Sequence, residues 1–201
     1  MKQLFSILFF LAAMLSQAQT LGGYQVGSAV QNFTLVNAAD GNTISLNNYS
    51  DKKVVVLLFT SNECPYSRLY EDRMIKLSQE FSDDGVIFLL INPNAGMNDK
   101  NENIAAMRKH IQATKSLFPY LADTTRMIAS DYNVTRLPEA FVLKRMENQF
   151  ILMYKGALDD NPQSPEQVMN KFLFDAIQAM ISNKTIKVSS TRPVGCLMKP
   201  Y

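Results

Sequence analysis

Residues 54–67, VVVLLFTSNECPYS, decide the fold of this chain. The first six, Val54 to Phe59, are apolar on both faces of an extended chain, which is typical of a strand buried inside a sheet. After a short polar loop, the apolar residues of 65–81 recur at spacings of three and four, and Pro65 takes the first position of the helix that this period predicts. Cys64 is therefore placed at or next to the N-cap of a helix that directly follows a buried strand.

Strands and helices continue to alternate outward from this stretch. Strands 54–59 and 86–91 are expected to be parallel neighbours in one sheet, joined by helix 65–81 in a right-handed crossover. A capping box at Ser164-Pro165-Glu166-Gln167 predicts the start of a last helix. We predict an α/β fold with a mixed central sheet flanked by helices, an N-terminal β extension and an irregular C-terminal tail. The other predicted elements are a hairpin-like entry at 27–46, helices at 98–114 and 125–133, and strands at 120–122, 140–144 and 150–154.

The amino-acid composition excludes several classes of function. The 201 residues are 47% apolar and 19% charged, the balance of one globular domain. Twenty Lys and Arg oppose 18 Asp and Glu without clustering, so a nucleic-acid partner is not expected. One His (His110) and two Cys (Cys64 and Cys196) are too few for a zinc site of His and Cys ligands, and we expect neither a metal nor another cofactor.

The N-terminus predicts export. A basic Met1-Lys2-Gln3, an apolar run over 4–15 and Ser16-Gln17-Ala18 form the three regions of a secretory signal peptide. The run is too short to span a bilayer, which needs about 20 residues, so no membrane association is expected after cleavage. We therefore divide the chain into a signal peptide (1–18), one domain (19–185) and a tail (186–201) that carries Cys196. The expected location is outside the cytoplasm, with the periplasm favoured over the medium, where two cysteines can keep a disulfide.

Cys64 is the candidate nucleophile. The unpaired N–H groups and the dipole of a helix N-terminus stabilise a thiolate and lower the pKa of a cysteine placed there. A thiolate is the attacking group both in disulfide exchange and in peroxide reduction. The alternative is that Cys64 is only a small buried apolar residue.

Eight segments of the chain match a known family in one order: 32–35, 60–66, 70–73, 91–94, 118–123, 137–141, 154–160 and 191–196. Through them the chain resembles the redoxin branch of the thioredoxin superfamily, the group of alkyl hydroperoxide reductases and thiol-specific antioxidants, and more narrowly the bacterial peroxiredoxin-like thioredoxin proteins. The resemblance implies a thioredoxin-like fold over nearly the whole mature chain, and it supports the fold more strongly than the activity.

Two departures from that family matter. A thioredoxin has a second cysteine three residues after the first, where this chain has Ser67. A peroxiredoxin has Thr or Ser three residues before its reactive cysteine, which Ser61 satisfies, and an Arg where Leu137-Pro138 stands here. Without that Arg a bound peroxide lacks a charge-assisted hydrogen-bond donor.

The resemblance also implies a substrate groove. Pro138 stands just before a predicted strand, where thioredoxins hold a cis-Pro beside the active cysteine; an ordinary trans Pro at a strand start is the alternative. In that fold the preceding residue, here Leu137, offers backbone groups to an extended substrate. Pro65, Tyr66, Leu137 and Pro138 are accordingly the predicted substrate-binding residues.

Cys196 is the only other thiol in the chain, 132 positions after Cys64, and so the only possible intramolecular resolving partner. A purely structural disulfide or an unpaired thiol are its alternatives. The sequence thus favours an exported thiol-disulfide oxidoreductase with Cys64 as nucleophile, Cys196 as resolving cysteine, and Ser61 and Ser67 donating hydrogen bonds to the sulfur. Its partners would be protein thiols or disulfides, or small hydroperoxides, and an external thiol reductant. A thiol peroxidase and a non-catalytic binding module with a static disulfide are the competing functions.

Overall fold

The computed structural model describes residues 22–114, 116 and 118–198, so the predicted signal peptide lies outside the described residues. No helix in the described part of the chain is long and apolar enough to span a membrane. The strands are β1 (Ala29–Val30), β2 (Thr34–Asn37), β3 (Thr43–Ser45), β4 (Val54–Phe59), β5 (Val86–Asn92), β6 (Tyr120–Ala122), β7 (Arg136–Leu137), β8 (Glu139–Met146), β9 (Gln149–Gly156) and β10 (Cys196–Leu197), and the α-helices are α1 (Pro65–Glu80), α2 (Ile104–Thr114), α3 (Met127–Asp131) and α4 (Phe172–Ile181).

A mixed sheet forms the centre of the molecule, with strand order β1-β9-β8-β4-β5-β6-β2-β3. β4 pairs in parallel with β5 and antiparallel with β8. The predicted parallel neighbours are therefore confirmed, with α1 between them in the chain. The predicted N-terminal β extension is also present, because β2 and β3 form a hairpin at one edge and β1 adds to the other.

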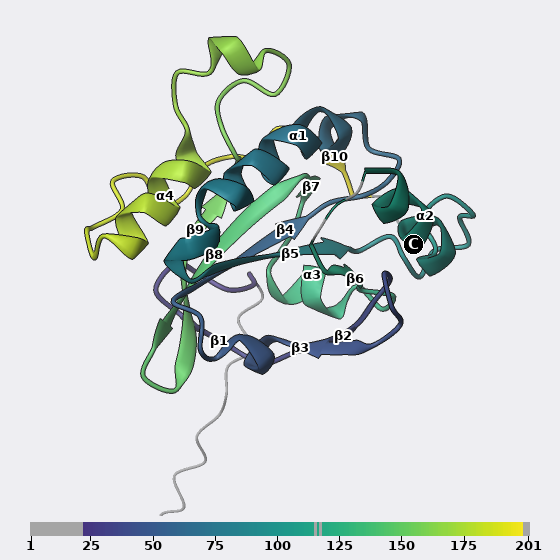
Figure 1. The fold of residues 1–201 in the computed structure, drawn as a ribbon, viewed down its shortest axis with the longest axis horizontal. Helices are drawn as coiled ribbons and strands as arrows, with labels where there is room; N and C mark the ends of the chain where they lie inside the picture. Colours follow the sequence, from purple (N-terminus) through teal and green to yellow (C-terminus); the bar gives the residue numbers. More distant parts are fainter. Residues whose placement is uncertain (1–21, 115, 117, 199–201) are drawn as a thin grey trace, which may run out of the picture.

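Burial explains why β4 is apolar at every position. All six of its residues are buried, and they alternate between two hydrophobic clusters on opposite faces of the sheet. Helices α1, α2 and α4 pack on the face that holds Val54, Val56 and Leu58, whereas α3 packs on the face that holds Phe59. Figure 1 shows α1 and α3 on opposite sides of the sheet.

The predicted start of helix 98–114 is wrong. α2 begins at Ile104, and the residues before it form turns. Asn103 accepts a hydrogen bond at Oδ1 from the N–H of Ala106 (2.9 Å), which is the contact of an N-cap residue. The polar stretch before Asn103 is thus free to fold back toward the loop that precedes Cys64.

The predicted capping box of the last helix is also wrong. Pro165–Gln167 form only a short 3₁₀ turn, Ser164 makes no side-chain cap, and α4 begins at Phe172. The carboxylate of Asp160 takes the N–H groups of Met169 and Asn170 at 3.0 Å each, and these contacts hold the chain extended before α4.

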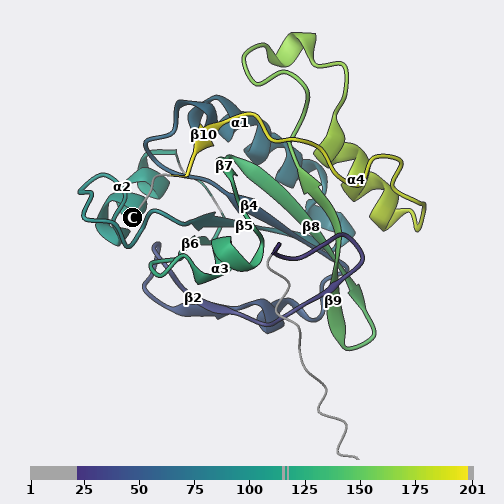
Figure 2. The ribbon, with the colours of Figure 1, turned by 180° about the vertical axis from the view of Figure 1, so that it is seen from behind.

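The C-terminal tail is more ordered than its sequence indicates. Most of it lacks regular structure, as predicted, but β10 pairs antiparallel with β7 in a second, two-stranded sheet. Figure 2 shows the yellow tail running from α4 to β10, which lies beside β7. The tail therefore returns Cys196 to the end of the central sheet.

The packing of β4 predicts how substitutions affect stability. Leu58 is fully buried, and Leu58→Ala should lower the free energy of unfolding by about 2–5 kcal/mol, since the cavity cannot collapse between sheet and helices. Leu69→Ala, at a side chain that is 46% exposed on α1, is the matched control and should cost about 0.5 kcal/mol or less. Urea unfolding of the oxidised protein measures both, and equal costs would contradict this packing.

Candidate active site

Cys64 occupies the N-cap of α1, as predicted. Its backbone is extended (φ −75°, ψ 116°), Pro65 follows at the first helical position, and the residue is 3% exposed. Its sulfur forms a disulfide with Cys196, with the two Cα atoms 6.0 Å apart. The structure thus brings together the two cysteines that the sequence singled out.

The disulfide lies against the paired strands β7 and β10. The Leu137–Pro138 peptide bond is cis, as the resemblance implied. Cys196 stands directly opposite Leu137 in the β7–β10 pair, and the carbonyl oxygen of Leu137 lies 3.1 Å from Cys64 Sγ. The tail therefore holds the backbone position that the resemblance assigned to an extended substrate.

Three further contacts hold the tail in place. A Cβ on Gly195 would collide with the carbonyl oxygen of Leu137, so only glycine allows this approach. Arg136 donates from Nη1 to the carbonyl of Gly195 at 2.8 Å. Farther back, Thr191 is fixed through its Oγ1, which accepts from the N–H of Ala157 (2.9 Å) and lies 2.7 Å from the hydroxyl of Tyr154.

In the disulfide state, Ser61 donates its hydroxyl proton to Glu102 Oε1 at 2.6 Å. The donation from Ser61 and Ser67 to the Cys64 sulfur stays a prediction for the reduced protein. Ser67 is buried, and its Oγ accepts the N–H of Ser61 at 3.4 Å. Both hydroxyls therefore organise the loop before Cys64, because that of Ser67 accepts a loop N–H and that of Ser61 donates to Glu102.

Glu102 is a site residue that the sequence analysis missed. Its side chain is fully buried, and its carboxylate accepts hydrogen bonds from the N–H groups of Asn62 and Glu63, both at 3.1 Å. Asn92 adds a third nitrogen donor at 2.9 Å. The only signal in the sequence was its place in a polar loop, which cannot tell a buried carboxylate from a solvated one.

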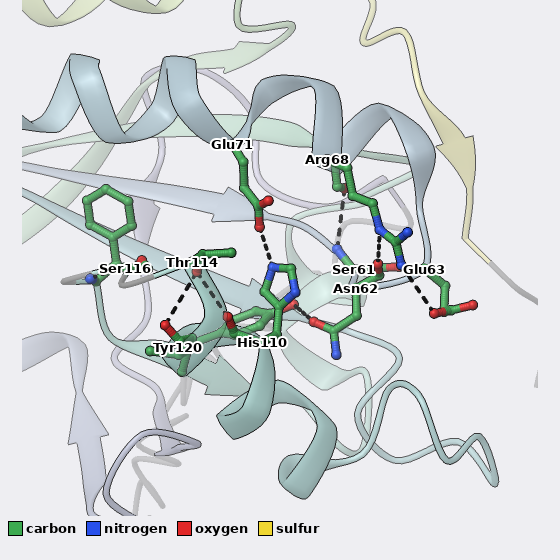
Figure 3. A network of polar contacts seen from close by, with 12 residues as sticks. Ser61, Asn62, Glu63, Arg68, Glu71, His110, Thr114, Ser116 and Tyr120 are labelled. Carbon is green, nitrogen blue, oxygen red and sulfur yellow. Dashed lines mark hydrogen bonds and ion pairs between the residues drawn. The ribbon is translucent and has the colours of Figure 1, made fainter.

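All four polar groups of Asn62 form hydrogen bonds that hold the same loop. Its N–H goes to Glu102, its carbonyl accepts from Arg68 Nε (2.9 Å), and its side chain donates to the Asn101 carbonyl and accepts from the hydroxyl of Tyr120 (3.0 Å). Figure 3 shows Arg68 reaching from α1 to Asn62 and to Glu63. The loop is therefore rigid on the side away from the tail.

The side chain of His110 is partly buried between two helices. Its Nε2 contacts the carboxylate of Glu71, which ties α2 to α1 (Figure 3). Among the residues that the structure describes, no group of three or more His, Cys, Asp or Glu side chains could hold a metal ion.

The predicted groove residues differ in exposure. Pro65 is exposed, whereas Tyr66 packs partly buried against the hydrophobic cluster that contains Cys64 and Leu137. Two apolar side chains of the tail near Cys196, those of Val194 and Leu197, are 49% and 67% exposed.

Glu139 is a second buried carboxyl that the sequence analysis did not assign. It follows Pro138, is 6% exposed, and accepts the N–H of Thr135 at 3.3 Å. Burial raises its pKa to about 7, an effect that the N–H groups of Thr135 and Arg136 and the charge of Lys155 partly offset. This carboxyl thus supports the turn that leads into β7.

Comparison with known proteins places the chain in a family. Residues 26–153 match the sequence model of the AhpC/TSA family. The chain belongs to the AhpC/TSA family. Its thioredoxin-like α/β fold, predicted from the sequence, is confirmed by solved structures of similar proteins. No curated protein sequence matches the chain.

Three solved structures show how far the similarity reaches. A hypothetical protein from Sinorhizobium meliloti 1021 is 26% identical, with a TM-score of 0.78 over 89% of this chain and 96% of its own. An uncharacterized conserved protein from Geobacillus kaustophilus is 25% identical, with a TM-score of 0.80 over 88% and 93%. A thiol:disulfide interchange protein from Bacteroides sp. is 17% identical (TM-score 0.56, 79% and 91%), which shows the fold alone.

Glu139 predicts a pH-dependent stability. Because its pKa rises on folding from an ordinary value near 4.5 to about 7, its contribution falls as the pH rises through this window, by roughly 3 kcal/mol in total. Glu139→Gln should flatten the pH dependence of the free energy of unfolding between pH 4.5 and 7. Glu80→Gln, at an exposed site on α1, is the control and should keep the slope of the unmodified protein. Urea unfolding at pH 5 and pH 8 decides, and identical slopes for Glu139→Gln and the unmodified protein would contradict the assignment.

Proposed function

We propose that this AhpC/TSA-family protein is an exported thiol-disulfide oxidoreductase in which Cys64 is the nucleophile and Cys196 the resolving cysteine. The observation that carries the proposal is the disulfide between a helix N-cap and a strand that pairs beside Pro138. A bridge that only stabilised the fold would need neither an N-cap position nor pairing at that edge.

The exchange proceeds in two displacements. In the reduced protein the Cys64 thiolate attacks one sulfur of a substrate disulfide, forms a mixed disulfide and expels the other substrate sulfur as a thiolate. Cys196, after losing its proton, then attacks Cys64 Sγ, forms the 64–196 disulfide and releases the second substrate thiolate. The substrate gains two electrons, the two cysteines lose them, and the released thiolates take up the two protons.

An external thiol returns the electrons. Cys64 is 3% exposed, whereas Cys196 is only partly buried, so an incoming reductant thiolate reaches Cys196 first. Attack there expels the Cys64 sulfur, which is the better leaving group because the N-terminus of α1 stabilises its thiolate. A second reductant thiol then frees Cys196. The compartment that suits this cycle is outside the cytoplasm, in line with the predicted signal peptide, and the periplasm is favoured.

A thiol peroxidase is the second candidate, in keeping with the family. In that cycle a hydroperoxide oxidises Cys64 to a sulfenic acid, and Cys196 condenses with it to form the disulfide and release water. The groups around the sulfur disfavour this function, because Ser61 donates to Glu102 and Arg136 donates to Gly195. A non-catalytic binding module would keep the same disulfide but would not turn over.

Single cysteine variants separate the roles. Cys64→Ala should abolish disulfide exchange, while Cys196→Ala should accumulate mixed disulfides with the substrate, because no resolving thiol remains in the chain. Insulin reduction with dithiothreitol and mass spectrometry of alkylated, unreduced samples measure the two effects. Loss of exchange in Cys196→Ala without any mixed disulfide on Cys64 would contradict the assigned roles.

Peroxide turnover should be slow. Hydrogen peroxide consumption with dithiothreitol as reductant is expected to be roughly a hundredfold or more below that of a dedicated peroxiredoxin, since a charged donor to the reacting oxygen is missing. The comparison uses a peroxiredoxin assayed under the same conditions. Cys64-dependent turnover at the rate of that enzyme would make the peroxidase the correct function.

A further inference from the structure

Glu102 stands out among the polar groups around Cys64 because it is a fully buried carboxylate that is paired with no cation among the described ion pairs. Its contacts are all with donors: the hydroxyl of Ser61, the N–H groups of Asn62 and Glu63, and the side-chain amide of Asn92. All four described partners are donors, which match the acceptor oxygens of a carboxylate.

The negative charge of Glu102 opposes the effect of helix α1 on the Cys64 thiolate. The N-terminus of α1 favours a thiolate on Cys64 through its N–H groups and dipole. Glu102 takes the N–H groups of the two residues just before Cys64, so these dipoles point at the carboxylate and not at the sulfur. The carboxylate also contacts the N–H of Glu63, the residue directly before the cysteine, and both Glu102 and Cys64 are buried, where solvent screens charges little.

We propose that Glu102 is a positioning residue that fixes the loop before Cys64 and at the same time disfavours the Cys64 thiolate. A less stable thiolate makes the reduced protein give up its electrons more readily, since the reduced state of a thiol pair is stabilised by the thiolate. The inference rests on the proposed oxidoreductase function and adds a direction to it: Glu102 shifts the pair toward reducing its substrates, against the effect of the α1 N-terminus.

Other charged groups on the elements around Cys64 are exposed or are held by other partners. Glu63 precedes Cys64 and is paired with Arg68 at 3.4 Å, but both side chains are substantially exposed and solvent screens them. From β7, Arg136 is turned to the carbonyl of Gly195, and from β8 Glu139 accepts N–H groups of the turn before β7. Glu102 is the one among these whose side chain is fully buried.

The test is the alkylation rate of Cys64 in the fully reduced, full-length protein. Iodoacetamide labelling from pH 5 to 9 with peptide mapping follows Cys64 and Cys196 separately, so Cys196 is an internal control. Glu102→Gln removes the charge at equal size, Glu102→Asp keeps the charge with a shorter reach, and Glu80→Gln is a matched surface control. If the Gln variant does not fold, Glu102→Ala replaces it, because alanine puts no amide NH₂ group against the N–H donors that face Glu102.

The proposal predicts that removing the charge raises the Cys64 rate at pH 6 roughly threefold and moves its profile to lower pH, with Cys196 unchanged. Glu102→Asp should stay near the unmodified protein. If the Gln and Asp variants shift Cys64 alike, or removal of the charge gives no increase, Glu102 acts only on the shape of the loop and the proposal is wrong. Because labelling needs no substrate, the outcome is independent of whether the proposed exchange activity is found.

Discussion

The close approach of the C-terminal tail to the cis peptide at Leu137–Pro138 is the constraint on which the site depends. A disulfide can form only where two Cα atoms come within about 4.4–6.8 Å, and Cys64 and Cys196 meet this limit at 6.0 Å although they are far apart in the chain. The approach needs the missing side chain of Gly195 and the pairing of β10 with β7. Without it, the N-cap of α1 would hold a lone thiol.

The two sides of the sulfur are built differently. On the loop side, Glu102 and Asn62 fix the backbone before Cys64 through buried hydrogen bonds, and such a network makes the loop rigid. On the tail side, the contacts are a two-residue strand and a few hydrogen bonds to a partly exposed segment, which local opening can break at small cost. A fixed cysteine beside a releasable partner is the arrangement that the proposed disulfide exchange requires.

The sequence predicted those parts of the structure that local patterns determine. The uniform apolar run of β4 and the Pro65 start of α1 placed Cys64 correctly, and the resemblance supplied the cis-Pro. Contacts between distant segments could not be predicted from local patterns. Nothing in the sequence of residues 98–103 shows that Glu102 turns inward, and the pairing of β10 depends on a partner strand about 60 residues earlier. The misplaced starts of α2 and α4 have a more local cause, the cap at Asn103 and the contacts of Asp160 with Met169 and Asn170, which helical periodicity does not reveal.

The reduction potential of the 64–196 disulfide tests the central claim most directly. Equilibration of the purified protein in dithiothreitol redox buffers, followed by alkylation and mass spectrometry, gives the fraction of disulfide at each potential. An exchanging pair should titrate reversibly as a two-electron couple at a potential above about −300 mV. A potential below about −300 mV, or reduction only after unfolding, would show a structural bridge and contradict the proposed oxidoreductase.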